Sequence, residues 1–345
     1  MGRIHESIGS ISLTGYSIAN PTRVAELIVF ISLIPIVGYW IAAIPRTAIG
    51  RTITWSFVAL SVLLVERISA EEPAGTRMLL MIVTLLWSIK SVVYGESRQR
   101  GYCELSYWQW LGFCVGWFGM RAELFRKVSA KPLPDWQNAI WRGLQNGCVG
   151  TALVFTAWWR VHEASPASVG IDIYRLWTAT ALLLLGLSLG FHFGLFNLLT
   201  GAWRYFGIRC VSLFRAPLRS RSLTEFWGRR WNVAFSEMTA LAVYRPLKQL
   251  PGTPRRVTVI ATIGAFLFSG LLHELAISVP VGAGFGLPML YFAIHAVGIL
   301  LERRLTFLES PLAGRLWTAT WVLLPLPLLF HRPFLQGCVW PIIGI

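Results

Sequence analysis

The sequence contains little charge, and acidic residues are especially scarce. Only 14% of its 345 residues are charged and 55% are hydrophobic, with 16 Asp and Glu against 31 Lys and Arg. Because soluble domains carry roughly a quarter charged residues, this composition excludes a soluble enzyme and a disordered or fibrous chain. It predicts an all-α polytopic membrane protein. The net charge of +15 then reflects orientation in a membrane, and no nucleic-acid partner is expected.

Several motifs of soluble enzymes are missing. The five cysteines form no CxxC pair, which predicts buried thiols in place of a disulfide framework or a metal knuckle; they are Cys103, Cys114, Cys148, Cys210 and Cys338. No GxSxG is present and the apolar segments contain no aspartate, so a Ser-His-Asp triad is not expected. Without internal repeats or a separate soluble stretch, residues 1–345 are predicted to form one membrane domain.

Apolar segments are numerous. About eight are close to the length that crosses a bilayer, and seven to nine spans fit the sequence; they are Val24–Ile44, Ile49–Val65, Met78–Val93, Gly147–Val161, Leu176–Leu199, Val257–Val279, Leu287–Leu301 and Leu316–Phe330. The Trp- and Gly-rich segment Tyr107–Met120 predicts a re-entrant or interfacial helix. The tail Leu335–Ile345 is too short to cross alone.

Charge in the connecting segments predicts the orientation. Lys90–Arg142 has a net charge of +4 and Arg204–Arg256 of +9, whereas Pro280–Gly286 has no charge. The positive-inside rule therefore places the long basic loop 204–256 in the cytoplasm, where a polyanionic co-substrate would arrive. Anchoring of this loop to anionic lipid headgroups is the alternative.

One segment of that loop has an amphipathic pattern. Ser222 and Glu225 predict a capping box, followed by apolar residues at helical spacing and a separate polar stripe that contains Asn232. We therefore expect one helix held against the membrane, ended by Pro246, with Asn232 in its middle and Arg229 one turn away. The apolar stripe consists of Phe226, Trp227, Trp231, Phe235, Met238 and Leu241.

The segment Val257–Val279 carries His273 and Glu274 side by side. At ~1.5 Å per residue, His273 lies about 24 Å beyond Val257, deep in the predicted span. Ionisable residues are costly in a bilayer and usually serve a function, although a hydrogen bond between helices would also account for His273. Ser269 and Gly270, one turn earlier, allow close packing or leave room for a substrate.

Two further histidines, His192 and His295, fall in other apolar segments. Imidazole binds several metals, so a site formed with His273 is conceivable. No metal is expected, however, because no two of these histidines have the i, i+4 spacing that joins ligands on one helix face.

Taken together, these motifs resemble a known family. The run Ser222–Asn232, followed by Phe268–Leu275 and more loosely by Tyr291–Gly298, is similar to the signature of the wax synthases. These are jojoba-type long-chain-alcohol O-fatty-acyltransferases related to the membrane-bound O-acyltransferase (MBOAT) superfamily. The resemblance covers the block 221–304.

The resemblance implies a bundle of tilted helices around an intramembrane reaction chamber. It also implies acyl transfer from acyl-CoA, acting as co-substrate without any permanently bound cofactor, to the hydroxyl of a lipid alcohol. His273 corresponds to the family's intramembrane histidine and Asn232 to its polar partner, a position where the family has Asn or His.

The chemistry of the residues agrees with these roles. His273 would be the general base that takes the alcohol proton, and Asn232 would hydrogen-bond the alcohol or the developing oxyanion. Glu274 and Ser269 would be supporting residues. Arg229 and Arg230 would meet the phosphates of CoA at the cytoplasmic mouth, beside Trp227 and Trp231.

Other functions remain open at this point. A sterol or a terpenoid-like alcohol could be the acceptor of an acyl or acetyl group. A proton-coupled transporter would use the His–Glu pair as a relay, but it predicts inverted repeats that the sequence lacks. A non-catalytic scaffold leaves the intramembrane pair unexplained. The sequence assigns no acyl chain length, host membrane or oligomeric state.

Overall fold

The computed structural model describes residues 14–45, 47–101, 104–163, 172–305 and 310–345, and within these ranges it contains helices and no strand. Among the described residues, six stretches are long and apolar enough to cross a membrane: Pro21–Ile41, Ala48–Ile68, Ala74–Gln99, Ile173–Tyr205, Pro254–Val281 and Pro311–Leu329. They confirm the predicted all-α fold of an integral membrane protein. Of the other two predicted spans, one forms the shorter apolar helix Leu287–Glu302 and one lies within the helix Trp136–His162.

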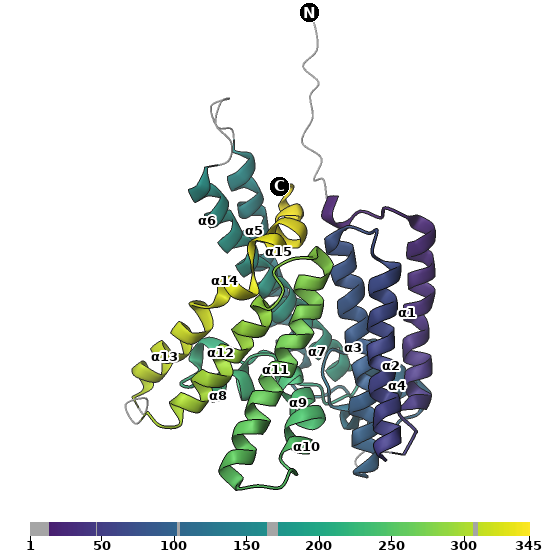
Figure 1. Ribbon diagram of the computed structural model, residues 1–345. Helices are drawn as coiled ribbons and strands as arrows, with labels where there is room; N and C mark the ends of the chain where they lie inside the picture. Colours follow the sequence, from purple (N-terminus) through teal and green to yellow (C-terminus); the bar gives the residue numbers. More distant parts are fainter. Residues whose placement is uncertain (1–13, 46, 102–103, 164–171, 306–309) are drawn as a thin grey trace, which may run out of the picture.

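Three antiparallel helices form one edge of the molecule (Figure 1). They are α1 (Pro21–Ile41), α2 (Ala48–Ile68) and α3 (Ala74–Gln99). The first two begin at side-chain caps, since Asn20 accepts a hydrogen bond from the N–H of Arg23 and Thr47 from that of Gly50. The third is the most buried of the six candidate spans and joins this edge to the rest of the bundle.

Lys90 begins the basic segment Lys90–Arg142 and also falls within the predicted span Met78–Val93. It lies inside α3, not in a loop, and its side chain is fully buried. Its ammonium group donates to the carbonyls of Phe113 and Trp117 and lies over the ring of Phe113. These contacts fix the short helix α4 (Tyr107–Cys114), whose Trp110 is also fully buried. The predicted helix in this segment therefore packs into the protein core.

The helices that follow pack against one another as a second group. It contains α5 (Trp136–His162), α6 (Ile173–Ser188), a π-helical turn η3 (Leu189–Leu195) and α7 (Phe196–Tyr205), with the short 3-10 helix η2 (Ala122–Phe125) before it. Gly150 and Gly186 permit the close contact between α5 and α6, since a Cβ on either would meet the other helix's backbone within 3 Å.

The C-terminal helices cross the centre of the view in Figure 1. α11 (Pro254–Val281) packs along α12 (Leu287–Glu302), and α13 (Pro311–Leu323), α14 (Leu326–Leu329) and α15 (Arg332–Phe334) follow. The tail forms η8 (Leu335–Val339) and η9 (Trp340–Ile343). Both contact η1 (Thr14–Tyr16), a 3-10 helix near the N-terminus. The tail does not cross the bundle and belongs to its buried core.

The predicted single helix after Ser222 is wrong. The chain forms η4 (Pro217–Arg219), α8 (Leu223–Glu225), the π-helical turn η5 (Phe226–Arg230), α9 (Val233–Thr239), a second π-helical turn η6 (Ala240–Tyr244) and α10 (Arg245–Leu247). The break falls at Trp231 and Asn232, which leave the helical conformation. Pro246 does not end the pattern, because it occupies the first turn of α10, where a missing N–H is tolerated.

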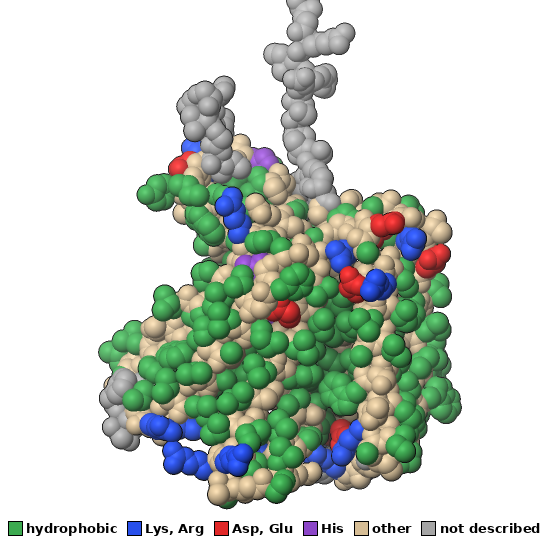
Figure 2. Space-filling model, in the orientation of Figure 1, with side chains coloured by type: hydrophobic (Ala, Val, Ile, Leu, Met, Phe, Trp, Pro, Cys, Tyr) green, Lys and Arg blue, Asp and Glu red, His purple; other side chains and the backbone are tan. Residues whose placement is uncertain are grey.

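Charged side chains gather at the two ends of the molecule. Figure 2 shows a hydrophobic middle, Lys and Arg concentrated at the lower end, and a mixture of both signs toward the upper right. The lower end contains α10, the start of α11 and the start of α2 (Figure 1). The described cysteines are free: Cys114, Cys210 and Cys338 are buried as predicted, Cys148 is exposed against the prediction, and Cys103 lies outside the described residues.

Candidate active site

A pocket of about 280 Å³ lies between the α8–α9 segment, α11 and α12. Five of the predicted site residues line it, namely Asn232, His273, Ser269, Trp227 and Trp231, whereas Arg229, Arg230 and Glu274 do not. A larger cavity of about 530 Å³ between α2, α3 and the η6–α10 segment contains none of the eight and no histidine. The smaller pocket is therefore the candidate site.

His273 is positioned by its own helix. Its Nδ1 lies 2.8 Å from the carbonyl oxygen of Ser269, one turn earlier on α11. Because a carbonyl oxygen can only accept, Nδ1 carries the proton and Nε2 retains a lone pair. The ring packs against those of Phe235 and Phe292, with centroids 5.3 and 4.4 Å away. The ring is thus oriented by its own helix and enclosed by an aromatic wall, and in its neutral form Nε2 has the lone pair.

Asn232 owes its position to the break in the helix. Its φ of 41° and ψ of 65° are left-handed, a conformation that asparagine tolerates better than most residues. Its side-chain oxygen caps α9 by accepting a hydrogen bond from the N–H of Phe235, at 3.3 Å. Its side-chain NH₂ has no hydrogen-bond acceptor among the described residues, and this group can only donate.

Aromatic residues line the pocket around His273 and Asn232. Trp231 stacks on Phe226 at 5.6 Å, and Trp227 packs against Phe292 at 5.6 Å and His295 at 5.1 Å. The buried Nε1 of Trp227 has no hydrogen-bond partner among the described residues. Sequence reasoning missed Phe292, although its place one turn before His295 was a signal.

The two supporting residues have structural contacts. The hydroxyl of Ser269 donates to the carbonyl of Ala265, so this residue serves His273 through its own carbonyl group. The carboxylate of Glu274 turns away from the pocket and accepts hydrogen bonds from the N–H groups of Gly286 and Met289, at 2.8 and 3.3 Å. It therefore caps the start of α12.

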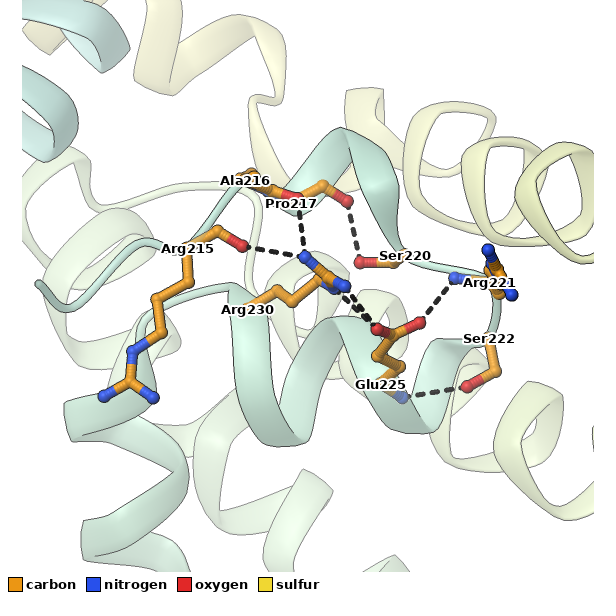
Figure 3. A network of polar contacts seen from close by, with 8 residues as sticks. All are labelled: Arg215, Ala216, Pro217, Ser220, Arg221, Ser222, Glu225 and Arg230. Carbon is orange, nitrogen blue, oxygen red and sulfur yellow. Dashed lines mark hydrogen bonds and ion pairs between the residues drawn. The ribbon is translucent and has the colours of Figure 1, made fainter. Parts of the chain in front are cut away.

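Arg230 and Glu225 form a network that holds the loop before α8 (Figure 3). The guanidinium is 2.6 Å from the carboxylate and also donates to the carbonyls of Arg215 and Ala216. Although burial opposes ionisation, the Arg221 N–H and the Arg230 guanidinium hold the pKa of Glu225 below its usual range. Ser222 caps α8 as predicted, but Glu225 reaches the N–H of Arg221, not that of Ser222.

Two other arginines, Arg229 and Arg303, are exposed near the pocket. Arg229 is exposed and has no hydrogen bond or ion pair among the described residues. Arg303, just after α12, is exposed and lines the pocket. Sequence reasoning missed Arg303, and its signal was a basic pair one residue after the apolar segment Leu287–Leu301.

The remaining intramembrane histidines do not join His273. The ring of His192 stacks on Phe214 at 4.6 Å, and His295 is fully buried with Nδ1 2.7 Å from the carbonyl of Tyr291. Within the described ranges, no group of three His, Cys, Asp or Glu side chains is placed to hold a metal ion.

Comparison with known proteins identifies this same segment. Residues 210–294 match the model of the family described as "Membrane bound O-acyl transferase family", which is 85 of the 345 residues. The matched range includes Asn232, His273 and the start of α12, and overlaps most of the block 221–304.

Curated relatives from plants align with part of the chain. An acyl-CoA–sterol O-acyltransferase 1 of Arabidopsis thaliana is 39% identical over 64 residues, 18% of this chain and 19% of the relative. A long-chain-alcohol O-fatty-acyltransferase of Simmondsia chinensis is 35% identical over 71 residues, 20% of each chain. A putative long-chain-alcohol O-fatty-acyltransferase 10 of Arabidopsis thaliana is 31% identical over 128 residues, 34% of this chain and 37% of the relative.

These alignments span only about a fifth of the length of the first two relatives. Within that segment, the predicted resemblance to the wax synthases and to the membrane-bound O-acyltransferases is confirmed.

Proposed function

We propose that the chain is a membrane-bound acyltransferase that moves an acyl group from acyl-CoA to the hydroxyl of a lipid alcohol, forming an ester of the wax type. No permanently bound cofactor takes part. One observation carries the proposal: His273, whose Nδ1 is held by the carbonyl of Ser269, and Asn232, whose side-chain NH₂ is a donor, line the same pocket from different elements.

The two residues supply complementary steps. Nε2 of His273 takes the proton of the alcohol as its oxygen attacks the thioester carbonyl carbon. The carbonyl oxygen becomes an oxyanion, which the NH₂ of Asn232 stabilises by donating a hydrogen bond. When the intermediate collapses, the C–S bond breaks and the imidazolium returns its proton to the departing CoA thiolate. The base is thereby restored.

The mouth of the pocket carries groups that suit acyl-CoA, the acyl donor. Arg229 and Arg303 are exposed cations at or beside the pocket, and guanidinium groups bind phosphates well. We assign them to the phosphates of CoA and assign Arg230 to the Glu225 network. Trp227 and Trp231 would line the path of the acyl chain. The gathering of Lys and Arg at this end (Figure 2) supports a cytoplasmic position for the basic loop 204–256.

A sterol is the second candidate acceptor. The relative named as a sterol acyltransferase aligns with the chain at 39% identity over 64 residues, and a hydroxyl on either acceptor would undergo the same chemistry. The ester that the protein forms therefore identifies the acceptor.

The test uses purified protein in lipid vesicles, labelled acyl-CoA and separate long-chain, sterol and terpenoid alcohols. We expect an alcohol-dependent labelled ester, with the largest yield from a long-chain alcohol. A largest yield from sterol would select the second candidate. Ester no more abundant than with protein-free vesicles, for every alcohol, would contradict acyl transfer, and uptake of an acidic solute in its place would favour the transporter.

A further inference from the structure

A carboxylate ties each end of α12 to a neighbouring element. Each of the two carboxylates accepts hydrogen bonds from backbone N–H groups at the start of a helix, α12 in one case and α8 in the other. At its beginning, Glu274 of α11 accepts hydrogen bonds from the N–H groups of Gly286 and Met289. At its end, Glu302 accepts hydrogen bonds from the N–H groups of Leu223 and Thr224, at 2.7 and 2.9 Å, and from the Thr224 hydroxyl at 2.5 Å. In Figure 1, α12 accordingly lies along α11 and reaches α8 with its lower end.

The two ends of α12 contact the two segments that form the candidate site, which are called its halves below. α11 carries His273, and α8 begins the segment that carries Trp227 and Asn232. Each carboxylate accepts hydrogen bonds from N–H groups that have no partner within their own helix, and it also complements the positive end of the helix dipole. α12 therefore links the histidine to the asparagine through two charge-assisted contacts.

The middle of α12 contacts both halves as well. The ring of Phe292 lies 4.4 Å from that of His273 and 5.6 Å from that of Trp227. Near its start, Met289 approaches Gly270 so closely that a Cβ on the glycine would lie 2.8 Å from the methionine sulfur. A shift of α12 along or away from α11 would consequently move one half of the pocket relative to the other.

We propose that Glu274 and Glu302 are positioning residues that set the separation of His273 and Asn232 through α12. The inference rests on the proposed acyl transfer for its kinetic consequence, although the geometric consequence is independent of it. Neither carboxylate touches the reacting atoms in this account. Each acts by fixing a helix end, and the two act on the same rigid element.

The chain supplies a matched control in Glu72. Its carboxylate accepts hydrogen bonds from the N–H groups of Ala19 and Asn20, at 2.8 and 3.0 Å, just before α1. The contact is chemically the same as at α12, but it holds a helix that contributes nothing to the pocket. Its loss is expected to lower thermal stability without changing the turnover of the folded protein.

The experiment compares Ala and Gln variants at Glu274, Glu302 and Glu72. For E274A and E302A we expect kcat per folded protein to fall about 10- to 100-fold, the size of effect that a displacement of about 1 Å can cause. The Kd of a non-hydrolysable acyl-CoA analogue should be unchanged. The Gln variants, which keep one acceptor oxygen, should recover part of kcat, and the Glu72 variants should keep wild-type kcat.

Spin labels at the exposed positions Leu218 and Leu267 report the geometry directly. We expect their distance distribution to broaden in E274A and E302A but not in E72A. Unchanged kcat and distances in both E274A and E302A, or equal losses of kcat in E72A, would overturn the proposal. Broadened distances together with no acyl transfer by the wild-type protein would contradict the proposed function while supporting the positioning role.

Discussion

The side-chain oxygen of Asn232 accepts a hydrogen bond from the backbone N–H of Phe235, three residues later. This contact starts α9 and fixes the orientation of the amide, whose NH₂ has no partner among the described residues. One side chain thereby combines a structural and a proposed catalytic role. The two roles can be separated by substitution, because they depend on opposite ends of the same amide.

Replacing Asn232 by Asp separates these roles. Aspartate caps helices as well as asparagine and tolerates the left-handed conformation, but it has no NH₂ to donate. We expect N232D to fold with near wild-type thermal stability and to lose about 100- to 1000-fold in rate, the effect of removing one oxyanion donor. N232A should lose the rate and also about 1–2 kcal/mol of stability, through the lost cap.

The histidine variant at the same position is the complementary case. Histidine also occurs more often than most residues in left-handed conformations, and its ring can donate a hydrogen bond. N232H should therefore retain more activity than N232D. Full activity of N232D would show that the donor is not needed and would reduce the site to His273.

The arginines around the pocket should behave differently from one another. The double variant R229Q/R303Q is expected to raise KM for acyl-CoA about 10-fold with little change in kcat, because about 1.4 kcal/mol of binding corresponds to a factor of ten. R230Q, which removes the partner of Glu225, should leave this KM unchanged and lower stability by up to about 1 kcal/mol. The reverse pattern in steady-state kinetics would assign CoA to Arg230.

The contact between α11 and α12 should be sensitive to a single methyl group. In G270A the new Cβ would meet the Met289 sulfur at 2.8 Å and its Cα at 3.0 Å, and we expect a loss of about 1–3 kcal/mol in unfolding free energy. The matched control is G147A in α5, where a Cβ would meet nothing within 4 Å. Helix propensity makes that change neutral or stabilising. Equal thermal stability of both variants would refute the tight contact.

The orientation of the chain is tested by labelling in sealed vesicles. On a background without native cysteines, Arg219→Cys in the basic loop should react with an impermeant maleimide from the cytoplasmic side. Glu71→Cys lies in the connection between α2 and α3, at the upper end of Figure 1, and should react only from the other side. The opposite pattern of labelling would invert the predicted topology.

The sequence predicted the helices well because apolar length is a local property. It also predicted one site for His273 and Asn232, through motifs in a short segment, and the two residues line the same pocket. It failed on the path of the chain between Phe226 and Val233. The break at Trp231 and Asn232 involves neither glycine nor proline, the residues that usually signal one. The available signal was Asn232 itself, because asparagine is a common N-cap residue.

Long-range contacts account for the other differences. Lys90, at the start of the basic segment 90–142, is a buried donor to carbonyls more than twenty residues away, and Glu302 caps a helix that precedes it by 78 or 79 residues. Periodicity and local motifs carry no information on such partners. The predicted position of Arg230 at the CoA mouth likewise rested on charge alone, while the structure gives it Glu225 and two carbonyls.

The central claim is that Nε2 of His273 is the base for acyl transfer in the pocket shared with Asn232. The most direct measurement is the rate of labelled ester formation by purified H273A in vesicles, with folded protein and acyl-CoA analogue binding quantified in the same samples. The account predicts that H273A folds and binds the analogue like the wild-type protein but forms no detectable ester. Ester formation by folded H273A at the wild-type rate would contradict it.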